Sequence, residues 1–254
     1  MIFDMHCHTA EGSPDAVVTL EQTITKLKEK GFNGMLVSDH DSYNGYKSLK
    51  RMPNDFLVLR GVEYDSLDGG HLLIVLPSCM KYDIFEYRGM RVIDVIKIVH
   101  ALGGIVGPAH PYDYSKLGFC NTKNKDNAEI LAQFDFIETF NACLYKKSSI
   151  LSEYLAKEYN KPCFGGSDSH TMAAVGLGYT NLKHDICNED DLIALVKQSD
   201  FNSFEASGEF FERKHERLHS ISIMTGGYMY GVLNSCLAYR HKNDSNIILK
   251  ALGV

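Results

Sequence analysis

Two histidines stand on either side of one cysteine near the start of the chain, in the stretch MIFDMHCHTAEGSPD. The apolar residues 1–3 run straight into this pair and predict a short buried strand that ends at His8. Because alternate side chains of a strand face the same side, His6 and His8 would project together, while Cys7 would face away as a small core residue. Two imidazoles placed in this way can chelate one Zn, Mn or Fe ion. A lone His-x-His pair also occurs on ordinary surfaces, so the rest of the chain has to decide.

Further residues that could do chemistry follow the other predicted strands. The sequence alternates amphipathic helical segments with short apolar strands, and VVTLEQTITKLKEKG, which ends at Gly31, followed by GMLVSDHD is a clear example. At or just past the ends of such strands stand His6, His8, Asp39, His40, Glu63, His110, Asn141, Asp168 and His170. Alternating strands and helices favour βα units around a parallel sheet, and a βα barrel carries its active site at the carboxyl ends of its strands. We therefore interpret these residues as parts of one site.

The length and composition suit one α/β domain. The chain has 254 residues, of which 44% are hydrophobic and 23% are charged. We expect a single domain over residues 1–254, built as a distorted seven-stranded (β/α)7 TIM-like barrel. Residues 1–200 would form the barrel core and residues 201–254 a helical C-terminal cap. A separate small helical module is the alternative for that last segment.

Charge and cysteine content restrict the partners. The formal net charge is −6, whereas surfaces that track nucleic-acid phosphates need an excess of Lys and Arg, so long nucleic acids are disfavoured. The seven cysteines include no CxxC pair and are typical of reduced thiols inside a cell. The sequence shows neither a signal-peptide pattern nor an apolar run of membrane-spanning length. We expect a cytoplasmic protein without a membrane partner, and no feature of the sequence indicates its oligomeric state.

The acidic and imidazole residues form a series of short motifs. In chain order these are His6-x-His8, Ser38-Asp39-His40-Asp41, Gly61-Val62-Glu63, His71, Ala109-His110-Pro111, Glu138-x-x-Asn141 and Ser167-Asp168-Ser169-His170, followed by GLGYT. In this order, over roughly residues 1–180, the motifs resemble those of the polymerase and histidinol phosphatase (PHP) family. The resemblance implies a barrel that holds two or three divalent metal ions, with Zn, Mn and Fe as the candidates.

The resemblance also implies which residues hold each ion. The first ion would be held by His6, His8, Glu63 and Asp168. The second would be bridged by Glu63 and completed by His71 and His110. The third would be held by Asp15, His40 and His170. Family members place the acidic residue of the third group directly after a serine, whereas here Pro14 separates Ser13 from Asp15.

The residue types fit a paired-metal hydrolase. A carboxylate has two oxygens and can bridge two cations, which a neutral imidazole cannot do, so one glutamate among many histidines suits such a site. Two ions about 3.5–4 Å apart activate a shared water and clamp an in-line displacement at phosphorus. We therefore expect a metal-dependent phosphoesterase that hydrolyses a small phosphomonoester. Its catalytic residues would be Glu63, Asp168 and His170, and its substrate-binding residues would be Tyr112, Asn141, Arg213 and Lys214.

Other interpretations stay open at this point. The resemblance also allows a nuclease or nucleotide phosphodiesterase that acts on short oligonucleotides. Amidohydrolases share the His-x-His start, but they generally bridge their metals with a modified lysine, and no lysine stands at a comparable strand end here. A barrel that keeps metals only for sensing or for structure would typically have lost ligands. Asp39 and Asp41 either orient ligand imidazoles or are simply solvated, and His100 is expected to be structural.

Overall fold

The structure is a computed structural model, and it describes residues 1–80, 85, 88–198, 201–212 and 244–254. The strands in these ranges are β1 (Ile2–Cys7), β2 (Gly34–Val37), β3 (Leu57–Ser66), β4 (Gly70–Val75), β5 (Ile105–Pro108), β6 (Ile137–Asn141), β7 (Cys163–Gly166), β8 (Gly178–Leu182) and β9 (Phe204–Gly208). The helices are α1 (Leu20–Glu29), α2 (Asn44–Lys47), α3 (Val92–Ala101), α4 (Ala128–Gln133), α5 (Lys146–Glu158), α6 (Glu189–Lys197) and α8 (Asp244–Leu252), with short 3-10 turns at Phe119–Asn121 and Phe201–Ser203. The fold is therefore a mixed α/β fold, as the sequence predicted.

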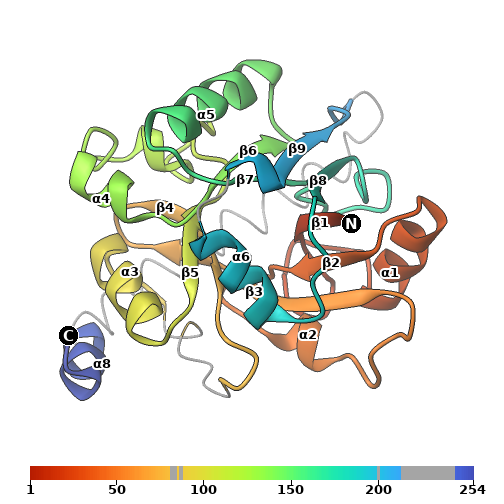
Figure 1. The fold of residues 1–254 in the computed structure, drawn as a ribbon, viewed down its shortest axis with the longest axis horizontal. Helices are drawn as coiled ribbons and strands as arrows, with labels where there is room; N and C mark the ends of the chain where they lie inside the picture. The colour runs from red at the N-terminus through yellow and green to blue at the C-terminus, as the bar shows by residue number, and fades with distance from the viewer. Residues whose placement is uncertain (81–84, 86–87, 199–200, 213–243) are drawn as a thin grey trace.

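The strands form two sheets rather than one uniformly parallel barrel. The larger sheet has the order β5-β4-β3-β2-β1-β8-β9, and β6 pairs with β7 in a second sheet (Figure 1). β1, β2 and β3 are parallel to one another, whereas β4, β5, β8 and β9 each join through antiparallel pairs. The expected (β/α)7 barrel is wrong in this respect. The turn between β3 and β4 has only three residues, which is too short for the crossover that a parallel strand needs.

The last segment also differs from the expectation. β9 lies inside the range assigned to a helical cap, but it pairs with β8 and completes the edge of the larger sheet. α8 is helical, as expected. Residues 213–243, which include Arg213 and Lys214, lie outside the described residues. None of the described helices has the length and apolar character that a membrane crossing requires.

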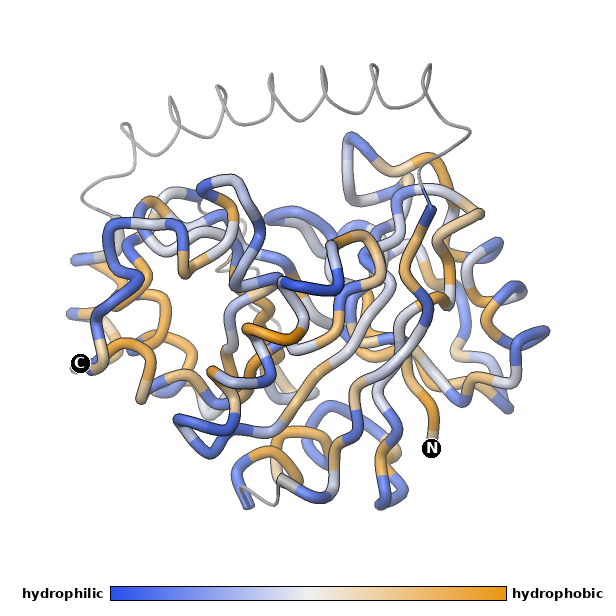
Figure 2. Tube along the Cα trace, turned by 90° about the horizontal axis from the view of Figure 1, so that it is seen from above, coloured by the Kyte–Doolittle hydropathy of each residue, from blue (hydrophilic) through white to orange (hydrophobic). Residues whose placement is uncertain are grey.

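Local sequence signals explain how the helices cover the sheets. α1 begins at the N-cap Thr19, whose side chain accepts from the backbone of Gln22 in a capping box, and Gly31 follows its end with a positive φ of 81°. Its buried residues include Leu20, Ile24 and Leu27, at the spacing of one helix face. Hydrophilic residues lie mainly on the outer turns and loops of the trace (Figure 2).

A glycine allows the two sheets to meet. A Cβ at Gly166 would lie 2.4 Å from the Cβ of His6, so only glycine permits β7 to approach β1 this closely. The N–H of Asp168 donates to the carbonyl of His6 at 2.7 Å, and Cys7 bridges to Ser169. This contact places the motif that follows β7 beside the motif that ends β1.

Candidate metal centre

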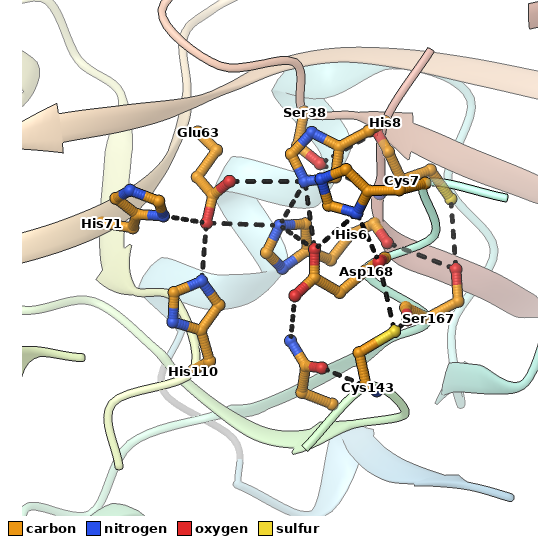
Figure 3. Close-up of polar contacts among 12 residues, drawn as sticks. His6, Cys7, His8, Ser38, Glu63, His71, His110, Cys143, Ser167 and Asp168 are labelled. Atoms are coloured by element: carbon orange, nitrogen blue, oxygen red, sulfur yellow. Dashed lines mark hydrogen bonds and ion pairs between the residues drawn. The ribbon is translucent and has the colours of Figure 1, made fainter. Parts of the chain in front are cut away.

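All nine residues predicted to bind metal gather at one end of the sheets. They come from β1 and its end (His6, His8), the following loop (Asp15), the end of β2 (His40), β3 (Glu63), β4 (His71), the end of β5 (His110) and the turn after β7 (Asp168, His170). Figure 3 shows six of these side chains pointing toward one another. The side chains of His6 and His8 are completely buried, and that of Glu63 is 1% exposed. Burying so many polar groups costs free energy unless they are hydrogen-bonded, paired with opposite charges or bound to a cation.

The first group has the dimensions of a tetrahedral ion site. The Nε2 atoms of His6 and His8 lie 3.1 Å apart. Oδ1 of Asp168 lies 3.5 and 3.1 Å from these two atoms, and the carboxylate of Glu63 lies 3.5 and 3.3 Å from them. Ligands bound tetrahedrally at about 2.0–2.1 Å stand about 3.3–3.4 Å apart. The four side chains are thus spaced as the ligands of one Zn-like ion would be.

Glu63 is shared between the first and second groups. Its Oε1 lies 2.9 Å from Nδ1 of His71 and 2.8 Å from Nε2 of His110. Glu63 also occurs in two of the three sets of described side chains that are close enough to hold an ion, namely with His6 and His8 and with His40 and His71. The structure therefore places this carboxylate where it could bridge two ions.

The third group lies beside the first. Oδ2 of Asp15 lies 3.4 Å from Nε2 of His40 and 3.3 Å from Nε2 of His170. The ring of His8 stacks on that of His170, with the centroids 4.2 Å apart, and lies tilted against that of His40, with the centroids 4.4 Å apart. Among the described residues, nothing hydrogen-bonds to the buried Oδ1 of Asp15. The insertion of Pro14 thus leaves the carboxylate within reach of both histidines.

The carboxylates of the cluster shift the pKa values of its imidazoles, and this indicates that the cluster attracts cations. Burial by itself raises the pKa of Glu63, but the surrounding imidazoles, His71 first, outweigh it and hold the pKa well below its usual range. Burial lowers the pKa of His110, yet the hydrogen bond and charge of Glu63 raise it to about 9. The carboxylates of Glu138 and Asp168 likewise overcome burial and hold the pKa of His6 well above its ordinary value. Protons on these imidazoles would supply the positive charge that divalent ions also supply, so the donor set fits such ions.

Strained backbone marks the same residues. Of the four described non-glycine residues with positive φ, His110 (29°) and Asp168 (51°) are predicted ligands, and Asp41 (46°) follows a third. Such conformations cost about 1–3 kcal/mol each and persist only where the surroundings impose them. The strain therefore lies where the strand ends turn their side chains into the cluster.

Asn141, which the sequence analysis assigned to substrate binding, hydrogen-bonds to two carboxylates at the cluster. Its Nδ2 donates to Oδ2 of Asp168 at 3.1 Å and to Oε2 of Glu138 at 3.3 Å, and its Oδ1 accepts from the N–H of Cys143 at 3.0 Å. These bonds occupy both hydrogens of the amide, and the one to Asp168 can orient that carboxylate.

Tyr112 is the other described residue that the sequence analysis assigned to substrate binding. The ring of Tyr112 packs against the apolar core, and its hydroxyl shares a hydrogen bond with Cys120. Both the ring and the hydroxyl of Tyr112 therefore have partners within the protein.

Residues flanking the ligands are engaged rather than solvated. Asp39 is fully buried and accepts from Thr9 and Ser13. Asp41 is buried and accepts from the N–H of Asp65. Cys7 is buried and faces away, as predicted. His100 pairs with Asp135, in agreement with a structural role.

Sequence reasoning did not assign a role to Glu138, although its motif was visible. Its Oε1 lies 2.8 Å from Nδ1 of His6, and its Oε2 accepts from the N–H of His110 at 2.5 Å. The carboxylate therefore holds ligands of two groups at once.

Comparisons with known proteins agree with this picture. The family described as PHP-associated matches residues 151–200. No curated protein sequence matches the chain significantly. PsfC from Pseudomonas syringae has a similar structure, with a TM-score of 0.61 and 16% identity over 93% of this chain and 98% of that protein.

Two further structures share the fold. A proposed metal-dependent phosphoesterase from Bifidobacterium adolescentis has a TM-score of 0.53 and 14% identity, over 77% of this chain and 96% of its own. The lesion-specific endonuclease from Pyrococcus furiosus has a TM-score of 0.53 and 17% identity, over 78% of this chain and 56% of its own. At these identities the likeness concerns the fold. The family match is confined to residues 151–200 and agrees with the PHP resemblance of the sequence motifs.

Proposed function

We propose that this protein is a hydrolytic enzyme of the PHP family that uses its metal centre to cleave a phosphate ester, with a small phosphomonoester as the substrate. The observation that carries the proposal is the position of Glu63, whose carboxylate touches the imidazoles of both the first and the second group. A carboxylate between two ions is the arrangement that two-metal phosphoryl chemistry needs.

Each part of the cluster has a defined task. Bound divalent ions would supply Lewis-acid activation of water and would offset charge on the phosphoryl oxygens. Glu63 and Asp168 stay ionised near neutral pH, because the nearby imidazoles hold the pKa of each carboxyl well below its usual range. Glu138 and Asn141 fix the orientations of His6 and Asp168. The site is therefore preorganised before a substrate arrives.

The exposure of the ligands indicates where a substrate enters. The side chains of Asp15, Asp168 and His170 are 13%, 14% and 20% exposed, whereas those of His6 and His8 are completely buried. Solvent thus reaches the cluster from the side of the third group.

A pair of exposed tyrosines supports a second candidate, a phosphodiesterase for nucleotides or short oligonucleotides. Tyr114 and Tyr145 lie on the segments that follow β5 and β6, and their ring centroids are 5.5 Å apart. Each is about two-thirds exposed. The neighbouring Lys116, Lys146 and Lys147 are exposed as well. Aromatic faces beside basic residues suit the stacking of bases next to phosphates.

A substrate panel tests both candidates. The protein, purified without chelator, would be assayed with phosphomonoesters, dinucleotides and single-stranded oligonucleotides, with added Mn²⁺ or Zn²⁺ and after chelation. Metal-dependent phosphate release from monoesters supports the first candidate. Cleavage of dinucleotides or oligonucleotides into shorter nucleotide products supports the second. Absence of hydrolysis of every phosphate ester by the metal-loaded protein would overturn both.

The tyrosine pair can be tested separately. For a nucleotide substrate we expect Tyr145→Ala to raise KM several-fold. Tyr154→Ala provides a matched control, because Tyr154 is equally exposed on α5, the helix that begins directly after Tyr145, but has no part in the pair. An equal effect of both substitutions would remove the support for base stacking.

A further inference from the structure

The facing nitrogens of His6 and His8 raise the question of where each ring carries its proton. A neutral imidazole has one N–H and one lone pair, and only the lone pair binds metal. On His6 the answer is direct, because Nδ1 lies 2.8 Å from Oε1 of Glu138 and a carboxylate accepts. The Nε2 of His6 therefore presents its lone pair to the first group.

The proton of His8 is determined by the hydroxyl of Ser13. Nδ1 of His8 lies 3.0 Å from Oγ of Ser13, and a hydroxyl could either donate or accept there. Ser13 has one hydrogen to give, and it donates this hydrogen to Oδ1 of Asp39 at 2.9 Å. The same Oγ accepts from the N–H of His40 at 3.1 Å. The contact with His8 must then be a bond that Nδ1 donates, which leaves the lone pair on Nε2.

Asp39 is held in place so that it can take this hydrogen. Its Oδ1 also accepts from the N–H of Thr9 at 2.7 Å, and its Oδ2 accepts from the hydroxyl of Thr9 at 2.8 Å. A Cβ at Gly12 or at Gly45 would lie 2.1 or 2.0 Å from Oδ2 of Asp39. Backbone therefore encloses the carboxylate on two sides, and Asp39 cannot turn away from Ser13 without displacing it.

We propose that Ser13 and Asp39 are positioning residues that keep the proton of His8 on Nδ1 and aim its Nε2 at the first ion. Through the N–H of His40, the same hydroxyl also fixes a ligand of the third group. Ser13 thus joins two groups that the sequence separates, from the loop that also carries Asp15. The inference rests on the proposed metal centre, but its chemistry is independent of the substrate.

The test removes or keeps the hydroxyl at position 13. Ser13→Ala removes the acceptor, so we expect the Zn²⁺ affinity of the first group to fall about 10–100-fold, the effect typical of losing a group that orients a metal ligand. Ser13→Thr keeps a hydroxyl and should restore most of the affinity. Ser149→Ala serves as the matched control, because Ser149 is buried and, among the described residues, its Oγ has no hydrogen-bond partner.

Nitrogen-15 NMR of the histidine rings reads the proton position itself. In the Zn²⁺-loaded wild type, His8 should show a protonated Nδ1 and a metal-bound Nε2. In Ser13→Ala, His8 should lose the sharp Nδ1–H signal or show both proton positions. Circular dichroism and the unfolding midpoint would establish that each variant is folded, and Asp39→Ala should shift His8 in the same direction.

Two outcomes would overturn the inference. One is Ser13→Ala with wild-type Zn²⁺ affinity and an unchanged His8 spectrum. The other is a wild-type His8 with its proton on Nε2. Spectra of the metal-free protein keep the test separate from the proposed function, because they report the proton of His8 even if no phosphate ester is hydrolysed.

Discussion

The first and third ligand groups are built differently, although His8 touches both. In the first group, His6 lies on β1, His8 follows directly after β1, and Glu63 lies on β3. These three side chains are at most 1% exposed. The third group depends on Asp15, which stands in a loop and is 13% exposed, and on His170, which is 20% exposed. One group is thus fixed by the sheet, and the other is assembled at its open side.

From this difference we predict how tightly each group binds an ion. Ligands whose positions are set by strands and by several hydrogen bonds need little reorganisation on binding, whereas loop ligands lose conformational freedom. We therefore expect the first and second groups to retain their ions during purification and the third group to exchange its ion readily.

The largest effect should follow from breaking the shared part of the site. Glu63→Gln removes a negative charge that faces five histidine side chains, and we expect hydrolysis to fall by about 10³-fold or more, with loss of metal from the first and second groups. Elemental analysis and kcat measured on the same sample would check this. Near-normal turnover with full metal content would contradict the bridging role.

A smaller and more selective loss of activity is expected from a change in the third group. Asp15→Asn weakens only the third group, so the variant should keep the other ions and lose activity by about 10–100-fold. Excess metal should restore part of the activity. Loss of every ion from this variant would show that the groups are not separable.

A still smaller effect is expected from Asn141→Ala. This change removes the amide that orients Asp168 without removing a ligand. We expect about a 10-fold fall in kcat with little change in KM if the main task of the side chain is to orient Asp168, because both amide hydrogens are already bonded within the protein. A rise in KM at constant kcat would instead support the original prediction that Asn141 binds substrate.

The last prediction concerns the metal-free protein. The pKa of His110 is raised from its ordinary 6.5 to about 9, so the folded chain binds this proton more tightly than the unfolded chain does. Its contribution to stability is complete below pH 6.5 and is lost as the pH rises through about 9. With chelator, the denaturant midpoint should fall over that range. With metal bound, the denaturant midpoint should stay nearly constant over the same pH range. An equal dependence of the midpoint on pH with and without metal would contradict the idea that bound ions replace these protons.

The sequence predicted the site more completely than the fold. Strand ends bearing His6, His8, His40 and Glu63 pointed to one cluster, because apolar runs followed by polar tips are short-range signals. The supporting bonds of Ser13 and Glu138 were not predictable, since a serine or glutamate near a motif gives no sign of which atom it contacts.

The sheet was harder to predict for a physical reason. A strand followed by a three-residue turn and another strand predicts a hairpin, but the β3 to β4 turn was placed within a barrel of parallel strands. The sequence analysis placed the β9 residues, FEASG, in a helical cap. This run is short, and it becomes a strand by pairing with β8, which lies more than 20 residues earlier. Pairing partners far apart in sequence are set by tertiary contacts, which a local pattern does not contain.

The central claim is most directly tested by locating the ions. A crystal structure of the protein purified without chelator, with anomalous scattering collected at the Zn, Fe and Mn edges, would place each metal. We predict one ion among His6, His8, Glu63 and Asp168 and a second beyond Glu63, beside His71 and His110. Metal-loaded crystals with no ion bound to Glu63 would contradict the account.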